Sequence, residues 1–131
     1  MNDRRERGDN MENLNLGMVE ARFADIIWEN EPLSTKELVA LCQKELQWKR
    51  TTTYTVLKKL CNRGIFITED SIVRSLISKN KFYAMRSESF VEEHFEGSLP
   101  AFLAAFTSRK ALTPEDLAEI KKLMDAYEKE S

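Results

Sequence analysis

The stretch that decides the fold is residues 48–64, which read WKRTTTYTVLKKLCNRG. Within it, side chains suited to burial recur three and four residues apart, the spacing of one helix face: Thr53, Val56, Leu57 and Leu60. Gly64 follows at the position where a helix typically ends in a left-handed glycine. We therefore expect a helix from about residue 50 to residue 63 with one buried face.

The opposite side of this helix carries residue types suited to a DNA duplex. We expect cations to lie along the phosphates: Lys49, Arg50, Lys58 and Lys59. We expect hydroxyl groups to lie at base edges in the major groove: Thr51, Thr52, Tyr54 and Thr55. Four threonines in five positions also lower helix propensity, a cost that sequences tolerate mainly at functional sites. An alternative stays open, in which these threonines only cap the first helical turn.

The flanking segments predict the rest of a domain that is mainly α with a small β-hairpin. One helix spans about residues 16–30, and a second begins at a capping box formed by Ser34 and Glu37. Residues 65–68 and 81–85 are rich in strand formers and predict a hairpin. Its wing loop, residues 69–81, would bring three cations to the DNA backbone: Arg74, Lys79 and Lys81. Three helices followed by a hairpin are typical of a winged helix-turn-helix.

The chain divides by composition into an N-terminal arm (residues 1–13, polar and flexible), a winged helix domain (14–86) and an acidic helical tail (87–131). A winged helix of about 70 residues can close its own core, so the apolar side chains of the tail are surplus. We expect them to form the interface of a homodimer: Phe90, Phe95, Leu99, Phe102, Leu103, Phe106, Leu117, Ile120 and Met124. In the alternative, the tail folds back over its own winged domain.

Composition argues against most enzyme classes. The 131 residues include 2 Cys, 1 His and 4 Gly, and they form no metal-binding, nucleophile–base or phosphate-loop pattern. We therefore expect no catalytic residues, no metal and no cofactor. The apolar runs are too short to cross a bilayer and the N-terminus shows no leader pattern, so we expect a cytoplasmic protein without a membrane partner.

The net charge of −2 hides a segregation of charge along the chain. Residues 36–63 carry 7 positive and 2 negative side chains, whereas residues 87–131 carry 5 positive and 10 negative ones. A basic block between acidic flanks can present a cationic face to phosphate despite the acidic balance. A solvated lysine-rich helix would give the same pattern, so charge supports DNA binding only together with the threonines.

The same residues resemble a known family. The segments Glu20 to Trp28 and Leu33 to Leu38, and above all the Trp-x-x-Thr-Thr-x-Tyr-Thr run from Trp48, are similar to the penicillinase repressor family. The resemblance extends over about residues 14–127. The family includes repressors of β-lactamase, methicillin-resistance and copper-transport genes. It implies a dimeric winged-helix repressor that occupies an operator, with Thr51, Thr52, Tyr54 and Thr55 in the base-reading helix.

The inducing signal is where this sequence departs from the family. Antibiotic-sensing members are cleaved, often at an Asn-Phe bond, and copper-responsive members carry C-terminal Cys-x-Cys motifs. This sequence has no Asn-Phe pair and no cysteine in residues 87–131. A signalling protease stays a candidate partner on the resemblance alone. Cys42 and Cys61 lie on apolar helix sides, which favours core packing over thiolate sensing.

We therefore expect a transcriptional repressor whose partners are a palindromic double-stranded DNA operator and a second copy of itself. Two copies would read half-sites about one helical turn apart, or a multiple of that distance. A rival of a different class stays open: a winged helix used for protein–protein assembly, whose basic helix meets an acidic partner without reading DNA sequence.

Overall fold

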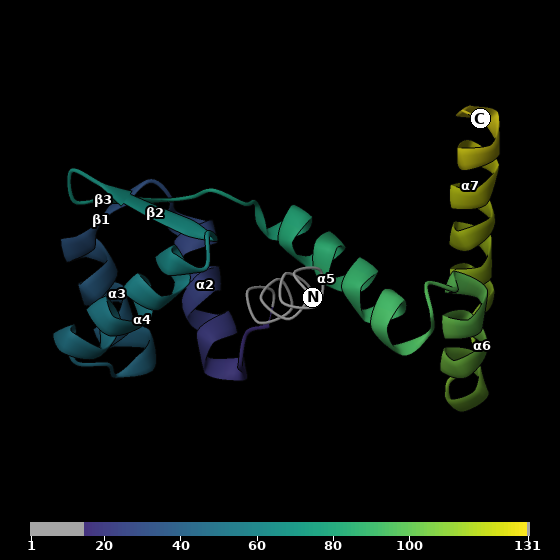
Figure 1. Cartoon of the computed structure of the whole chain (residues 1–131), viewed down its shortest axis with the longest axis horizontal. Helices are drawn as coiled ribbons and strands as arrows, with labels where there is room; N and C mark the ends of the chain where they lie inside the picture. The colour runs from purple at the N-terminus through teal and green to yellow at the C-terminus, as the bar shows by residue number, and fades with distance from the viewer. Residues whose placement is uncertain (1–14, 131) are drawn as a thin grey trace, which may run out of the picture. The chain divides into compact units, whose positions relative to one another are not determined.

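The computed structural model describes residues 15–130, and the predicted N-terminal arm, residues 1–13, lies outside the described residues. The chain forms two compact units that divide between Ser89 and Phe90. Figure 1 labels the helices and strands of both units. Each unit is described by itself. None of the described helices is both long and apolar enough to span a bilayer.

The first unit contains three helices in helix-turn-helix order: α2 (Met18–Asn30), α3 (Thr35–Leu46) and α4 (Arg50–Asn62). α3 begins as predicted, because the hydroxyl of Ser34 accepts the backbone N–H of Glu37 at 3.0 Å. It ends at Leu46, and the residue that follows, Gln47, has a left-handed φ of 55°. Gly64 has a φ of 80°, which confirms the left-handed glycine predicted after α4.

A small antiparallel sheet in the order β1-β3-β2 completes the wing: β1 (Leu33–Ser34), β2 (Phe66–Glu69) and β3 (Ile72–Ser75). The hairpin of β2 and β3 closes through Asp70 and Ser71, whose φ values of 51° and 63° suit the tight turn of a two-residue hairpin. β1 pairs with β3 and so ties the start of α3 to the hairpin. The sequence does not reveal β1, because only two residues form it.

The predicted second strand of the hairpin, residues 81–85, is wrong. These residues lie in α5 (Lys79–His94), and β2 pairs instead with β3, inside the segment that the sequence predicts as the wing loop. Ser78 explains the helix, because its hydroxyl accepts the N–H of Lys81 at 3.2 Å and its carbonyl accepts that of Phe82 at 2.8 Å. The loop expected over residues 69–81 therefore shrinks to a two-residue turn.

One hydrophobic core holds the first unit together. Every helix and the hairpin contribute buried side chains to it, among them Phe23, Ile27, Leu38, Cys42, Leu57, Leu60, Phe66, Val73 and Phe82. The Trp28 ring lies 5.4 Å from that of Phe66, and its Nε1 donates to the carbonyl of Ile77 at 3.0 Å. α2 thus packs against both the hairpin and the segment before α5. The predicted winged helix-turn-helix is confirmed.

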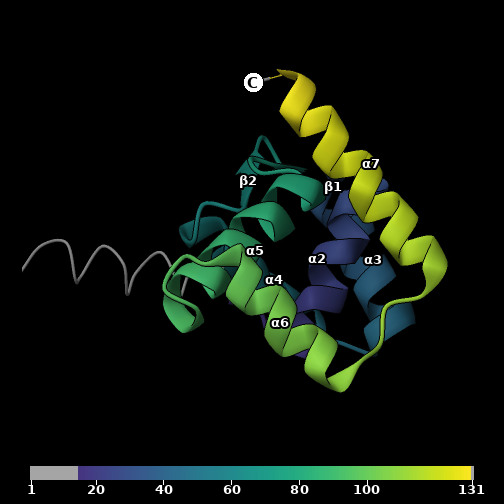
Figure 2. The same cartoon turned by 90° about the vertical axis from the view of Figure 1, so that its right-hand side faces the viewer.

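The second unit contains the end of α5, then α6 (Leu99–Arg109) and α7 (Pro114–Glu130). Ser98 and Thr113 cap these helices by accepting the N–H groups of Ala101 and Asp116 at 3.1 and 3.0 Å. Figure 2 shows that α6 and α7 diverge from the segment that joins them instead of packing side by side. No residue of α6 or of the described α7 is buried, so this unit has an incomplete core.

Glu31, which follows α2, ties the chain to the hairpin. Its carboxylate accepts the N–H of Ser75 at 2.9 Å and the Ser75 hydroxyl at 2.7 Å.

Glu31→Ala leaves both partly buried donors without this acceptor, so we expect the free energy of unfolding to fall by about 2 kcal/mol in urea denaturation of the full chain. Glu29→Ala, on the exposed side of α2, is the control and should change it by less than about 0.5 kcal/mol. Equal losses for both variants would contradict this role of Glu31.

Candidate nucleic-acid interface

Among the described residues of the first unit, 15–89, no other element covers the outward side of α4. Its residues at helical spacing are exposed: Thr51, Thr55, Lys58 and Asn62. The other predicted contacts on and beside α4 are also exposed: Lys49, Arg50, Thr52, Tyr54 and Lys59. Thr53 alone of the threonines in α4 is buried, at 1% exposure. A helix with one side in the core and a bare polar side has the shape that the major groove, about 12 Å wide, admits.

The threonine hydroxyls of α4 differ in what they can offer to a base edge. Thr55 Oγ1 donates to the carbonyl of Thr51 at 2.9 Å, so its remaining capacity is as an acceptor. Within residues 15–130 the hydroxyls of Thr51 and Thr52 have no hydrogen-bond partner and can donate or accept. The face therefore combines free donors, an acceptor and methyl groups, which suits readout of the major groove.

One flank of α4 meets the N-terminus of α3. A side-chain hydrogen bond from Thr35 lowers the pKa of Tyr54, and the Arg50 guanidinium lies over the Tyr54 ring, 5.6 Å from its centroid. The N–H of Thr35 donates to the carbonyl of Ser71, in the hairpin turn, at 2.9 Å. Thr35 thus lies where α3, α4 and the hairpin meet.

Thr35 and its neighbour Lys36 are candidate contacts that the sequence analysis missed. Lys36 is exposed in the first turn of α3, where the helix dipole favours an anion. The capping box at Ser34 was an available signal, because it fixes the start of a helix. What the sequence could not show is that this start lies beside Tyr54.

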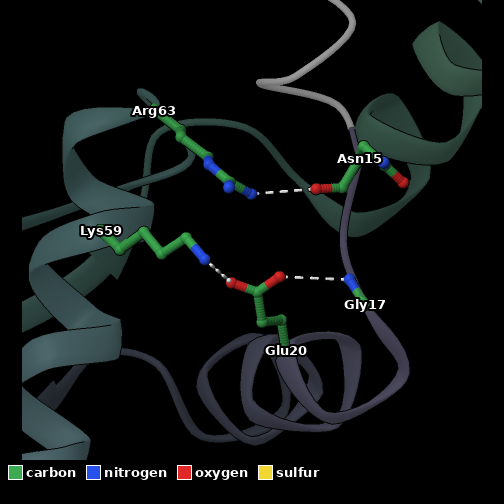
Figure 3. Close-up of polar contacts among 5 residues, drawn as sticks. All are labelled: Asn15, Gly17, Glu20, Lys59 and Arg63. Carbon is green, nitrogen blue, oxygen red and sulfur yellow. Dashed lines mark hydrogen bonds and ion pairs between the residues drawn. The ribbon is translucent and has the colours of Figure 1, made fainter.

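The other flank of α4 meets the N-terminus of α2 (Figure 3). Lys59 Nζ lies 2.9 Å from Glu20 Oε2, and the other carboxylate oxygen of Glu20 accepts the N–H of Gly17 at 3.1 Å. The hydrogen bond to Lys59 is the main cause of a lowered pKa of Glu20. Arg63 donates to the carbonyl of Asn15 at 2.9 Å. Lys59, a predicted phosphate contact, is therefore paired with a carboxylate in the free chain.

The hairpin does not present the predicted basic loop. Its turn carries Asp70, and Arg74 lies on β3 with its guanidinium 3.3 Å from the carboxylate of Glu69. The prediction of a cationic wing tip is wrong, because the turn forms earlier in the sequence than expected. The tip carries two carboxylates, and the one basic residue beside it is paired.

The remaining wing cations lie on α5. Lys79 Nζ is 2.9 Å from Asp25 of α2, a hydrogen bond that raises the pKa of Lys79, and Lys81 is exposed. By contrast, three predicted cations on and beside α4 have no ion pair within the described part of the chain: Lys49, Arg50 and Lys58. The structure therefore concentrates unpaired positive charge on α4 rather than on the hairpin.

The predicted dimer residues all lie in the second unit. Exposed members are Phe90, Leu99, Leu103, Phe106, Leu117 and Met124, and partly buried ones are Phe95, Phe102 and Ile120. Phe102 links α5 to α6, because its ring centroid lies 6.1 Å from that of Phe90 and 5.6 Å from that of Phe95. The apolar side of α7 has no such covering, as Leu123 at 70% and Met124 at 59% exposure show.

The cysteines belong to the folded core of the first unit rather than to a reactive site. Burial raises the pKa of the Cys42 thiol to about 11, so it stays protonated at neutral pH. Cys61 is partly buried, with its Sγ 3.7 Å from the hydroxyl of Thr68. Residues 15–130 contain no group of three or more His, Cys, Asp or Glu side chains that could hold a metal ion.

Known proteins are similar to this chain over most of its length. The family described as penicillinase repressor matches residues 16–126 of the chain. The penicillinase repressor of Bacillus licheniformis is 20% identical over 112 residues, which cover 82% of this chain and 88% of that protein. The methicillin resistance regulatory protein MecI of Staphylococcus aureus is 18% identical over 114 residues, which cover 84% of this chain and 93% of that protein.

The family match extends from the start of α2 almost to the end of α7, so it includes both units. It confirms the resemblance drawn from the residues around Trp48. It also agrees with a regulatory rather than an enzymatic protein, since both relatives are named as regulators. The chain belongs to the penicillinase repressor family.

Proposed function

We propose that this chain is a repressor that binds a palindromic operator as a homodimer, with α4 of each copy in the major groove. The observation that carries the proposal is the bare outward side of α4, where hydroxyls and unpaired cations share one exposed surface. The names of the two relatives support regulation of resistance genes as the setting. A signalling protease as inducing partner rests on the family resemblance and has no further support in the structure.

Residues on and beside α4 divide into two roles in this proposal. Lys49, Arg50 and Lys58 neutralise phosphate, because long cations at the edges of the helix reach the backbone. The base-reading set is Thr51, Thr52, Tyr54 and Thr55. Arg74 and Lys79 contribute less than the sequence suggested, since each must first leave its carboxylate, while Lys81 has no such cost within the described chain.

The dimer proposal rests on the second unit. α6 and α7 expose apolar side chains, and neither helix buries a residue within its own unit. A second copy brings an identical apolar surface to it, as a two-fold interface requires. Such a dimer presents two α4 helices and so matches a palindrome.

The first test is of phosphate contact. Lys58→Ala should weaken binding to operator and random duplex alike, and the plot of log affinity against log salt should become shallower by about 0.9 for each copy bound. Fluorescence anisotropy with a duplex selected by this protein from a random library measures both quantities. Lys122→Ala, which removes the same charge from α7, is the control and should leave the slope unchanged. Salt-insensitive or absent binding by the wild type would instead favour the protein-assembly function.

The second test is of base reading. Thr51→Val keeps the shape of the side chain and removes a hydroxyl that has no partner in the described chain, so it should lower operator affinity about tenfold and leave random-duplex affinity unchanged. The operator-to-random ratio in competition titrations reports the change. An equal loss on both duplexes would show that Thr51 acts through the backbone.

The third test is of the dimer. Met124→Glu places a carboxylate on the exposed apolar side of α7, so sedimentation at micromolar concentration should shift from dimer to monomer with unchanged helical circular dichroism. Ala118→Glu adds the same charge on the polar side of α7 and should leave the dimer intact. A dimer that survives Met124→Glu would place the interface elsewhere.

A further inference from the structure

Glu20 holds one of the cations that α4 offers to DNA. Its carboxylate lies 2.9 Å from Lys59 Nζ, and the exposed fractions of the two side chains are 20% for Glu20 and 51% for Lys59 (Figure 3). Lys59 follows Thr52 by seven residues, which places both on the same stripe of α4, at the edge of the bare side. The ammonium group is thus beside the proposed DNA surface, with a protein anion already bound to it.

A carboxylate and a phosphate oxygen make the same kind of charge-assisted hydrogen bond to an ammonium group, so they compete for it. Exposed ion pairs are weak, and a flexible lysine can exchange one partner for another. We propose, on the basis of the proposed function, that Glu20 is an internal counter-ion that competes with DNA phosphate for Lys59 and so lowers the affinity for DNA. Glu20 is then a determinant of affinity that never needs to contact the duplex.

The alternative is that the ion pair serves to position α4, and other contacts make that role unnecessary. Leu57 and Leu60 of α4 are buried in the same core as Phe23 of α2, so the buried side of α4 holds this helix in the unit. Arg63 also binds the carbonyl of Asn15 at 2.9 Å, at the same junction. The helix start at Gly17 depends on the other oxygen of Glu20, not on Lys59.

The ion pairs Glu69–Arg74 and Asp25–Lys79 have similar chemistry but lie on other elements than α4. Neither cation lies on α4, whereas Lys59 does. Glu20 is therefore the carboxylate whose removal should change the charge of the α4 surface most directly.

Glu20→Gln in the full chain tests this proposal. The amide oxygen can still accept from Gly17, while Lys59 loses its anion. Affinity for operator and random duplex should rise about twofold to fivefold for each copy bound. The slope of log affinity against log salt should become steeper by about 0.9 per copy. Fluorescence anisotropy at salt concentrations from about 0.05 to about 0.2 M measures both quantities. Glu29→Gln removes the same charge from α2 and is the control for a general change in net charge.

The same substitution in a Lys59→Met background should have no effect beyond that of Glu29→Gln, because the competing cation is absent. Urea unfolding of each variant reports folding separately. If Glu20→Gln loses as much affinity as Lys59→Met, the ion pair positions α4 and the proposal is wrong. The proposal is also wrong if Glu20→Gln gains no more affinity than Glu29→Gln. Failure of the wild type to bind any duplex in a salt-dependent way would instead refute the proposed function.

Discussion

The structure depends on the burial of one side of α4 in the core of the first unit. Thr53, Leu57 and Leu60 are almost fully buried there, against side chains from α2, α3 and the hairpin. Because a helix has two sides, fixing this one also fixes which residues face outward. Thr51, Thr52, Thr55, Lys58 and Lys59 are exposed as a direct consequence, and the proposed contact with DNA rests on that exposure.

Much of the first unit could be predicted from its sequence because the signals are local. The Ser34 N-cap, the apolar spacing in α4 and the glycine at position 64 each act within a few residues and appear in the structure as expected. The second strand could not be placed in this way, because residues 81–85 have strand-like composition but follow a serine that caps a helix. Local capping and a tight turn outweighed strand propensity in this region.

The candidate site was predictable in its residue types but not in its electrostatics. The sequence predicts Lys59, Arg74 and Lys79 as phosphate contacts, yet each lies near a carboxylate that is distant in sequence or across a turn. Two of these pairs join α2 to residues of α4 and α5, and the third joins the two strands of the hairpin, so all three depend on the folded structure. Unpaired positive charge is therefore smaller and more localised than the basic block of the sequence suggests, and within the described chain α4 and its N-cap hold three of the unpaired cations, Lys49, Arg50 and Lys58.

We propose that the outward side of α4 lies along a DNA duplex. The most direct measurement is a titration of the isotopically labelled chain with a selected duplex, followed by the backbone amide signals in NMR. We expect the largest shifts in residues 49–59 and at the start of α3, with the interior of α2 little changed. Shifts that spare α4 and fall on another surface of the first unit would contradict it.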